Sequence, residues 1–500
     1  MPTSTKDRSN CHNEQLIHLF TQQKTDFNQS PLLSLQQRLQ QLKALKSAVL
    51  KHKAELVQAM SEDFGHRSKT DSLIGDIFPV ISQINYTIKN LKKWMKPSKR
   101  KAGLLLTPAK IIVEYQPKGV VGIVAPWNFP IMLSLSPLVT SIAAGNRAMI
   151  KVSEFTPATN TILSSLIGSV FSTNQVAIVE GDVDVATSFT ALNFDHLFFT
   201  GSTTVGKHVM RAAANNLTPV TLELGGKSPV IVADDISIET AVERIIYGKC
   251  LNAGQICVSP DYVLCPLDKM EQFIQAYQNK FQILYPDFAN NDDYSQIINT
   301  KQAQRLSTLL QDAMNKGAKV YSADTMGECD TGEILTTLDN KDSTDITSHS
   351  QSYLNKKWPT QILVNVNDDM HIMQQEVFGP LLPIIGYQSL AEAIDYVNSH
   401  PRPLALYLMS YDKNTQAQVL QKTHSGGVCI NDTVFHVAAE DAPFGGIGDS
   451  GMGHYHGVEG FKTMSHAKTV LQRGQFNSGK FIQPPYNKLI QKLILAFFIR

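Results

Sequence analysis

Cys257 is the residue best suited to covalent chemistry, and it lies in the segment NAGQICVSP at residues 252–260. The segment follows the predicted end of a helix, where a thiol is more often exposed than inside an element. An unperturbed thiol has a pKa of about 8.5 and is only about 3% ionised at neutral pH, so a nucleophilic role needs a base or a positive dipole nearby. The spacing of Cys250, Cys257 and Cys265 fits no zinc site, and no metal is expected. A lone cysteine is also often purely structural, so nucleophile and packing residue remain alternatives at this point.

Two polar residues could assist a nucleophilic cysteine. Glu223 lies in an apolar stretch directly before two glycines, and burial would raise the pKa of its carboxyl and suit it to act as a general base. The alternative for Glu223 is an ion pair with Lys227 at the end of a strand. Asn128 lies between Pro126 and Pro130, where a predicted strand gives way to a helix. Its amide could point into a cleft or cap the helix, and the sequence leaves both open.

Two glycine-rich segments resemble phosphate-binding loops. Residues 201–207 follow a predicted strand and open a predicted helix, but His208 stands where a P-loop needs Ser or Thr to hold magnesium. What remains is a helix N-terminus that could bind a phosphate, or a tight packing turn. Residues 446–451 match G-x-G-x-x-G, but no apolar strand leads into them. We therefore interpret 446–451 as a long loop and not as a dinucleotide fingerprint.

The elements around these residues alternate between strand and helix. Apolar runs predict strands, and segments of helical periodicity between them predict helices. Repeated units of this kind form a parallel sheet that is covered on both faces. The predicted strands are 119–125, 147–152, 175–180, 196–200 and 219–224, and the predicted helices are 130–144, 157–171, 183–191 and 204–215.

Helical and alternating patterns also lie on either side of this block. Residues 34–64 carry apolar residues at helical spacing, with Ser34 as the expected N-cap. A second alternating block over 229–409, with helices at 238–249 and 301–316, predicts a second α/β domain. Residues 324–355 are rich in Thr, Ser, Asp and Asn and are expected to form an exposed loop.

The composition is that of an ordinary globular protein large enough for two or three domains. Of the 500 residues, 43% are hydrophobic and 18% charged, and the formal net charge is +1, which gives no field to attract nucleic acid. Six scattered cysteines and the lack of a signal-like apolar segment in residues 1–20 favour a reducing, cytoplasmic location. The apolar stripe at 489–499 is too short to span a bilayer.

Six motifs, taken together and in order, resemble those of the NAD(P)-dependent aldehyde dehydrogenases. The resemblance covers residues 35–470, and CVSPDY at 257–262, RPLALY at 402–407 and DFGHRS at 63–68 resemble the class 3 and coniferyl aldehyde dehydrogenase branch. The six motifs are PWNFP at 126–130, KVSE at 151–154, FTGS at 199–202, ELGGKSP at 223–229, GQIC at 254–257 and EVFGP at 376–380.

The resemblance implies a covalent mechanism. Cys257 would attack the aldehyde to give a thiohemiacetal, whose oxygen the Asn128 amide and the Cys257 backbone N–H would hold. Hydride loss would leave a thioester, and water activated by Glu223 would release a carboxylic acid. The implied substrate is a coniferyl-type aromatic aldehyde or a medium- or long-chain aliphatic one. The residues alone also admit two rivals: a P-loop ATPase, and a cofactor-free thiol hydrolase or esterase.

The resemblance also implies a cofactor site. Lys151 and Glu154 would hold the adenosine ribose, and Glu376 and Phe378 the nicotinamide ribose and ring. A carboxylate at the ribose hydroxyls would repel a 2′-phosphate, so NAD is favoured, although NADP remains an alternative. The turn that would lie near the pyrophosphate contains Gly201, Ser202 and Gly206.

The expected fold is α/β: a doubly wound, Rossmann-like cofactor domain, an α/β catalytic domain and a small oligomerisation arm. The boundaries are 1–103 and 119–225 for the cofactor domain, 226–432 for the catalytic domain, and 104–118 and 433–500 for the arm and the C-terminal region. We expect a homodimer that binds a small aldehyde and no nucleic acid. The C-terminal stripe is expected to pack on its own protomer or on its mate, with peripheral membrane contact as the alternative.

Overall fold

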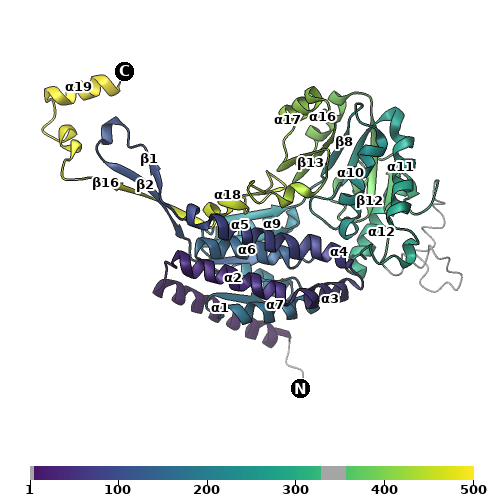
Figure 1. Cartoon of the computed structure of the whole chain (residues 1–500), viewed down its shortest axis with the longest axis horizontal. Helices are drawn as coiled ribbons and strands as arrows, with labels where there is room; N and C mark the ends of the chain where they lie inside the picture. The colour runs from purple at the N-terminus through teal and green to yellow at the C-terminus, as the bar shows by residue number, and fades with distance from the viewer. Residues whose placement is uncertain (1–4, 328–355, 500) are drawn as a thin grey trace.

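The computed structural model describes residues 5–327 and 356–499 and contains three sheets within them. Two large sheets form the body of the molecule, and a third, narrow sheet extends away from it (Figure 1). Most of the predicted loop at 324–355 lies outside the described residues, because these end at 327 and resume at 356.

The first large sheet has the order β15-β7-β6-β3-β4-β5. All its strands are parallel except β15, which pairs antiparallel with β7. The carboxyl ends of the parallel strands therefore meet at one edge, which is where open α/β sheets bind ligands. The strands are β15 (Gly451–Met452), β7 (Val220–Leu224), β6 (His196–Gly201), β3 (Val120–Val124), β4 (Arg147–Lys151) and β5 (Val176–Val179).

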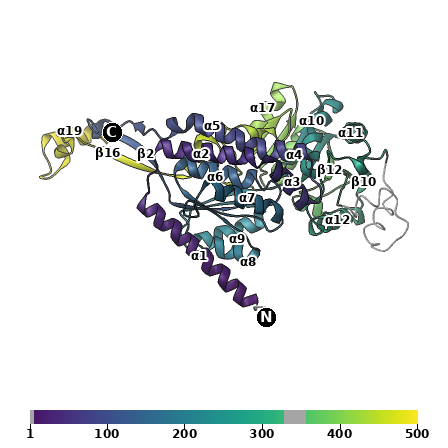
Figure 2. The same cartoon turned by 60° about the horizontal axis from the view of Figure 1, so that its bottom comes forward.

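Helices cover both faces of this sheet, because successive side chains of its buried strands point to opposite sides. Ile123, Ile150 and Phe198 pack with the helices of one face, whereas Met149 and Phe199 pack with those of the other. The first group is α2 (Leu35–Lys51), α5 (Phe78–Trp94), α6 (Met132–Ala144) and α7 (Pro157–Val170), and the second is α1 (Thr5–Gln29), α8 (Val183–Thr190) and α9 (Thr203–Ala214). Figure 2 shows α1, α8 and α9 together on one side of the sheet.

The ends of these helices follow from specific caps. Ser34 and Gln37 form a capping box at the start of α2, as expected for Ser34. The helix predicted over 34–64 is broken at His52 into α2 and α3 (Lys53–Phe64), at the point where the apolar spacing widens. The other predicted elements of this domain agree with the structure, with small differences at their ends.

The second large sheet has the order β10-β11-β12-β9-β8-β13-β14 and is parallel except for β10. Its helices are α10 (Ile238–Cys250) and α11 (Met270–Leu284) on one face, and α12 (Thr300–Asn315), α15 (His371–Gln374), α16 (Leu390–Ser399) and α17 (Lys413–Lys422) on the other. The strands are β10 (Lys319–Ser322), β11 (Gln361–Val364), β12 (Leu381–Tyr387), β9 (Tyr262–Pro266), β8 (Pro229–Val232), β13 (Ala405–Met409) and β14 (Gly427–Ile430).

The third sheet forms an arm that projects from the body, and α19 (Leu489–Phe498) lies at its far end (Figure 1). Its strands are antiparallel in the order β1-β2-β16. Within the described ranges no helix is long and apolar enough to cross a membrane. The arm's strands are β1 (Ser98–Arg100), β2 (Lys110–Pro117) and β16 (Ser465–Gln472). The short helix α18 (Gly457–Thr463) directly precedes β16, whereas α4 (Lys69–Ser72) lies in the body next to α3 (Figure 1).

Candidate active site

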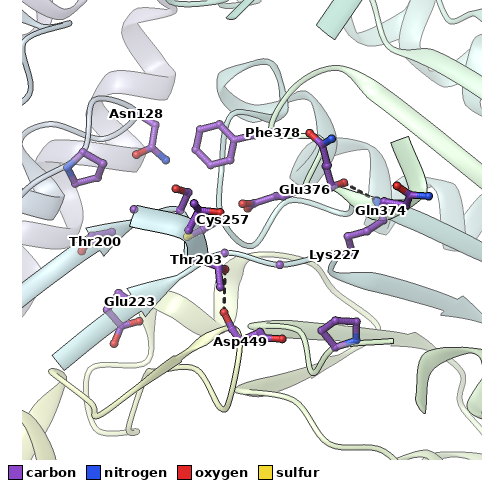
Figure 3. Close-up of a pocket in the computed structure, with 18 of the residues that line it drawn as sticks. Asn128, Thr200, Thr203, Glu223, Lys227, Cys257, Gln374, Glu376, Phe378 and Asp449 are labelled. Carbon is purple, nitrogen blue, oxygen red and sulfur yellow. Dashed lines mark hydrogen bonds between the residues drawn. The ribbon is translucent and has the colours of Figure 1, made fainter. Parts of the chain in front are cut away.

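A cavity of about 990 Å³ lies between the two large sheets, at the carboxyl edge of the first. The first domain lines it with residues 126–128, 200–204, Glu223 and 225–227, and the second with residues that include Cys257, Glu376 and Phe378. Figure 3 shows Asn128, Glu223 and Glu376 arranged around Cys257. The fold thus brings together side chains that are widely separated in the sequence.

Residues 251–261, which connect α10 to β9 and are called the Cys257 loop below, have an unusual backbone conformation. After α10 ends, Asn252 and Ala253 both adopt left-handed backbone angles, with φ of 50° and 53°. Such angles cost about 1 kcal/mol or more for a residue such as alanine, so surrounding contacts must impose them. The Asn252 N–H donates to Asp71 at 3.0 Å, and the Gln255 side chain donates to the Asn252 carbonyl at 2.9 Å. These contacts direct the half-buried Cys257 toward the cavity.

The Cys257 thiol has a pKa above the ordinary range for a cysteine. Burial raises its pKa to about 12, and the negative charges of Glu376 and Glu223 add to the effect. The neighbouring Cys250 also forms no disulfide bond, but its side chain is buried, as expected for a packing residue. Nucleophilic attack by Cys257 therefore requires a group that removes the proton or stabilises the thiolate.

Asn128 lines the same cavity as Glu223 and Glu376. Its side chain is 2% exposed, and one Nδ2 hydrogen donates to the Gln255 carbonyl at 3.0 Å. The N-cap alternative is wrong, because α6 begins at Met132 and the carboxylate of Asp76 accepts the Ile131 and Met132 N–H groups, both at 3.0 Å. A primary amide has two N–H hydrogens, so a second donor remains for a bound group.

Glu223 is an unpartnered buried carboxyl on β7. Neither of its oxygens has a hydrogen-bond partner, and burial raises its pKa well above the usual value. The alternative ion pair with Lys227 is wrong, because the Lys227 ammonium binds Asp261 instead. A carboxyl of raised pKa beside a cavity is, once ionised, a stronger proton acceptor than an ordinary carboxylate.

Glu376 and Phe378 lie on an irregular segment that faces the end of β7. Burial raises the pKa of Glu376 to about 8, and one of its carboxyl oxygens lacks a partner. Phe378 has a φ of +48°, and its ring meets Trp127 edge-to-face at 5.3 Å. A Cβ on Gly225 would lie 2.2 Å from the Glu376 carboxylate, so glycine at this position makes room for it.

The other predicted cofactor residues lie at the same edge of the sheet but not all in the cavity. Gly201 and Ser202 line it, where Ser202 caps α9 by accepting the Val205 N–H. Gly206 is buried and does not line it. Lys151 and Glu154 also lie outside the cavity lining, at the end of β4, with their charged groups 3.7 Å apart.

Three residues that hold the backbone of the site in place were not predicted from the sequence. Arg305 on α12 donates to the carbonyls of residues 376–378, with its shortest bond, 2.6 Å, to that of Val377. Asp261 accepts the Val377 N–H at 2.8 Å, and Asp71 supports Asn252. The motif CVSPDY contains Asp261, and the motif DFGHRS ends three residues before Asp71. No sequence motif included Arg305.

Comparisons with known proteins agree with this geometry. A family model described as "Aldehyde dehydrogenase family" matches residues 4–340 and 348–470. The chain belongs to the aldehyde dehydrogenase family. This aldehyde dehydrogenase is 49% identical to a "Probable coniferyl aldehyde dehydrogenase" of Pseudomonas aeruginosa, with 97% of each chain covered. It is 42% identical to the "Coniferyl aldehyde dehydrogenase" of a Pseudomonas species, covering 94% of this chain and 93% of that one.

A solved structure of Staphylococcus aureus AldH, described as its substrate-bound state, is also similar to this aldehyde dehydrogenase. The TM-score is 0.86 at 37% sequence identity, with 96% of this chain and 99% of that chain covered. The predicted α/β fold class and the predicted enzyme class, an NAD(P)-dependent aldehyde dehydrogenase that forms a carboxylic acid, are confirmed. The P-loop ATPase and the cofactor-free thiol hydrolase find no support among these matches.

Proposed function

We propose that Cys257 is the nucleophile of this aldehyde dehydrogenase and that the substrate is a coniferyl-type aromatic aldehyde. The observation that carries the assignment is the convergence of Cys257, Asn128 and Glu223 on one cavity. The sulfur adds to the carbonyl carbon and gives a thiohemiacetal. Oxidation of that carbon leaves a thioester, and water hydrolyses the thioester to the acid and the free thiol.

Asn128 stabilises the oxygen that becomes negative during these steps. Its free N–H and the backbone N–H of Cys257 are the proposed donors, and each such donor contributes about 3 kcal/mol in the transition state. An amide suits this role because it donates a hydrogen bond without losing a proton at neutral pH.

Glu223 is the proposed base for thioester hydrolysis. It comes from the strand edge next to the cavity, and it has no competing partner for its carboxylate. Because burial raises its pKa, the ionised form readily takes a proton from water.

The residues around the cavity fit a dinucleotide. The unpartnered Glu376 oxygen and the absent Cβ of Gly225 suit a ribose, and the N-terminus of α9 suits a pyrophosphate. When bound, the cofactor supplies the hydride acceptor. We assign Lys151 and Glu154 to the far ribose, and the Glu154 carboxylate favours NAD over NADP.

The substrate class rests on the two relatives that are named for coniferyl aldehyde. A medium- or long-chain aliphatic aldehyde is the alternative. Formation of NADH across aldehydes of graded length and aromaticity distinguishes them, and repetition with NADP tests the cofactor preference.

We further propose a homodimer joined through the arm, in a reducing cytoplasmic compartment. The arm carries α19, on which Leu489, Leu493 and Phe497 are all more than half exposed. Such apolar side chains need a partner, and a second copy is the one we favour over a membrane surface. The described cysteines 250, 257, 265 and 429 are free thiols, in keeping with a reducing environment.

The decisive experiment is Cys257→Ala. We expect it to abolish aldehyde oxidation while NAD binding persists, and retained turnover would refute the nucleophile. Glu223→Gln should release NADH in a burst and then turn over slowly, because the thioester accumulates. A full steady-state rate in that variant would exclude Glu223 as the base.

A further inference from the structure

A buried ion pair connects the Cys257 loop to the segment that carries Glu376 and Phe378. Lys227 follows β7 and the two glycines after it, and Asp261 lies between Cys257 and the start of β9. Their side chains are 11% and 4% exposed, and their charged groups are in direct contact. The mechanism described above assigns no task to either residue.

The Lys227 ammonium uses all three of its hydrogens. Besides the Asp261 carboxylate, it donates to the carbonyl of Ile372 at 2.7 Å and to that of Gln375 at 3.1 Å. An ammonium group has three donors and no acceptor, so its bonding capacity is filled. Lys227 therefore binds α15 at Ile372 and the start of the segment that follows it at Gln375.

Asp261 completes the connection from its other side. One carboxylate oxygen accepts from Lys227, and the other accepts the Val377 N–H at 2.8 Å. Its own N–H donates to the Ser228 carbonyl at 2.9 Å. Asp261 thus joins the chain next to Lys227, the Cys257 loop and the centre of residues 376–378.

We propose that Lys227 and Asp261 are positioning residues that fix Glu376 and Phe378 relative to the Cys257 sulfur. The proposal rests on the proposed function, in which Glu376 faces a ribose of the bound dinucleotide, and on the family resemblance, which implies that Glu376 and Phe378 hold the nicotinamide end. Residues 375–378 belong to no helix or strand, so contacts with neighbouring groups must define their position. Arg305 binds their carbonyls, whereas the ion pair holds the Gln375 carbonyl and the Val377 N–H.

The rate of hydride transfer depends on where Glu376 and Phe378 lie relative to the Cys257 sulfur. A misplacement of about 1 Å costs on the order of a hundredfold in rate, because the reacting atoms must be close and aligned. Thioester formation at Cys257 needs the same alignment, whereas simple alkylation of its thiol does not. The pair should therefore affect cofactor-dependent steps and leave the intrinsic reactivity of the thiol intact.

The test uses Asp261→Asn and Lys227→Met in the full chain. Asp261→Asn keeps the side-chain size but replaces one acceptor oxygen with an NH2 group, so it can accept from Lys227 or from the Val377 N–H but not from both. Lys227→Met removes the donors. The measurements are kcat/KM for NAD, the isotope effect with aldehyde deuterated at the carbonyl carbon, and the rate of Cys257 alkylation by iodoacetamide without NAD. We expect kcat/KM to fall at least about tenfold and the isotope effect to rise, while alkylation stays within about twofold.

Asp195→Asn is the matched control. It breaks the Lys24–Asp195 ion pair of 2.7 Å at the opposite, amino edge of the first sheet. This variant should lower the melting temperature and leave the isotope effect unchanged. Lys227→Arg keeps the charge but changes the donor geometry, so it should give an intermediate isotope effect and serves if Lys227→Met does not fold.

Wild-type kcat/KM and isotope effect in a folded Asp261→Asn or Lys227 variant would overturn the proposal. A fall in melting temperature with the isotope effect unchanged, as in the Asp195 control, would also overturn it, because the pair would then be purely structural. The proposed function fails separately, through turnover in Cys257→Ala. A negative result for the ion pair leaves the requirement for Cys257 untouched.

Discussion

Replacing Asn128 with alanine separates catalysis from folding at this site. The substitution removes the amide that we assign to the developing oxyanion and leaves the backbone around Cys257 in place. In the structure, the Asn128 amide makes one bond, to the Gln255 carbonyl at 3.0 Å. Asn252 donates to the same carbonyl at 3.4 Å, so the carbonyl keeps a partner in the variant.

The two expected magnitudes differ widely. The folding cost is that of one net hydrogen bond, about 1 kcal/mol, because no buried group is left without a partner. The transition-state cost of losing one oxyanion donor is about 3 to 4 kcal/mol, which corresponds to a fall in kcat of about a hundredfold to a thousandfold. Asn128→Ala should therefore fold and bind NAD normally but oxidise aldehyde very slowly.

The assay is NADH formation at saturating aldehyde and NAD, with a thermal melt of the same preparation. Asn146→Ala is the control, since Asn146 is an equally buried asparagine that donates to the Met464 carbonyl at 2.8 Å, away from the cavity. It should lose stability and keep its kcat. A kcat within about tenfold of wild type for a folded Asn128→Ala would refute the oxyanion assignment.

Two further predictions follow from the charges and the space in the cavity. Because burial and the neighbouring carboxylates raise the pKa of Cys257 to about 12, its alkylation without NAD should speed up nearly tenfold per pH unit from about pH 7 to about pH 10. A rate that levels off above about pH 9 would show an ordinary thiol. Gly225→Ala places a Cβ 2.2 Å from the Glu376 carboxylate, so it should raise the KM for NAD about tenfold and leave alkylation of Cys257 unchanged. An unchanged KM would mean that Glu376 does not bind the cofactor.

The sequence was sufficient to place the parallel strands of the first domain, and it singled out Cys257, Asn128 and Glu223, which the structure brings to one cavity. Apolar runs and helical periodicity are local signals, and these three residues lie where predicted strands or helices end. The partner of Lys227 could not be predicted from spacing alone. Gly226 has a φ of +146°, and the chain turns there so that Lys227 points to Asp261 and away from Glu223.

The backbone of the Cys257 loop was also beyond prediction. Alanine does not favour left-handed backbone angles, so the residues around Ala253 give no local signal that predicts them. The conformation depends on Asp71, which accepts the Asn252 N–H from a part of the chain far away in sequence. Long-range contacts of this kind leave no periodic trace in a single sequence.

The segment 446–451 shows why a motif needs its structural context. The sequence predicts a loop there, and in the structure the last residue of the segment starts β15, which pairs with β7 so that Gly451 lies opposite Glu223. A Cβ on Gly451 would lie 2.1 Å from the Leu222 carbonyl, and one on Gly446 would lie 1.9 Å from the Ser450 carbonyl. These two glycines allow one backbone segment to pack directly against another. In a dinucleotide-binding G-x-G-x-x-G motif, by contrast, the glycines allow the backbone to approach a phosphate.

That packing has a consequence for Glu223. β6 and β15 occupy both edges of β7, so the backbone around the carboxyl is rigidly paired. At the same loop, Asp449 accepts a hydrogen bond from Thr203 through its carbonyl at 2.9 Å, which ties β15 to the start of α9 (Figure 3). The fold therefore pairs the strand that carries Glu223 on both edges and leaves both oxygens of its carboxyl without a partner beside the cavity. An unpaired carboxylate on a rigid strand can accept a proton from water without first giving up another bond, and this is the condition that thioester hydrolysis imposes.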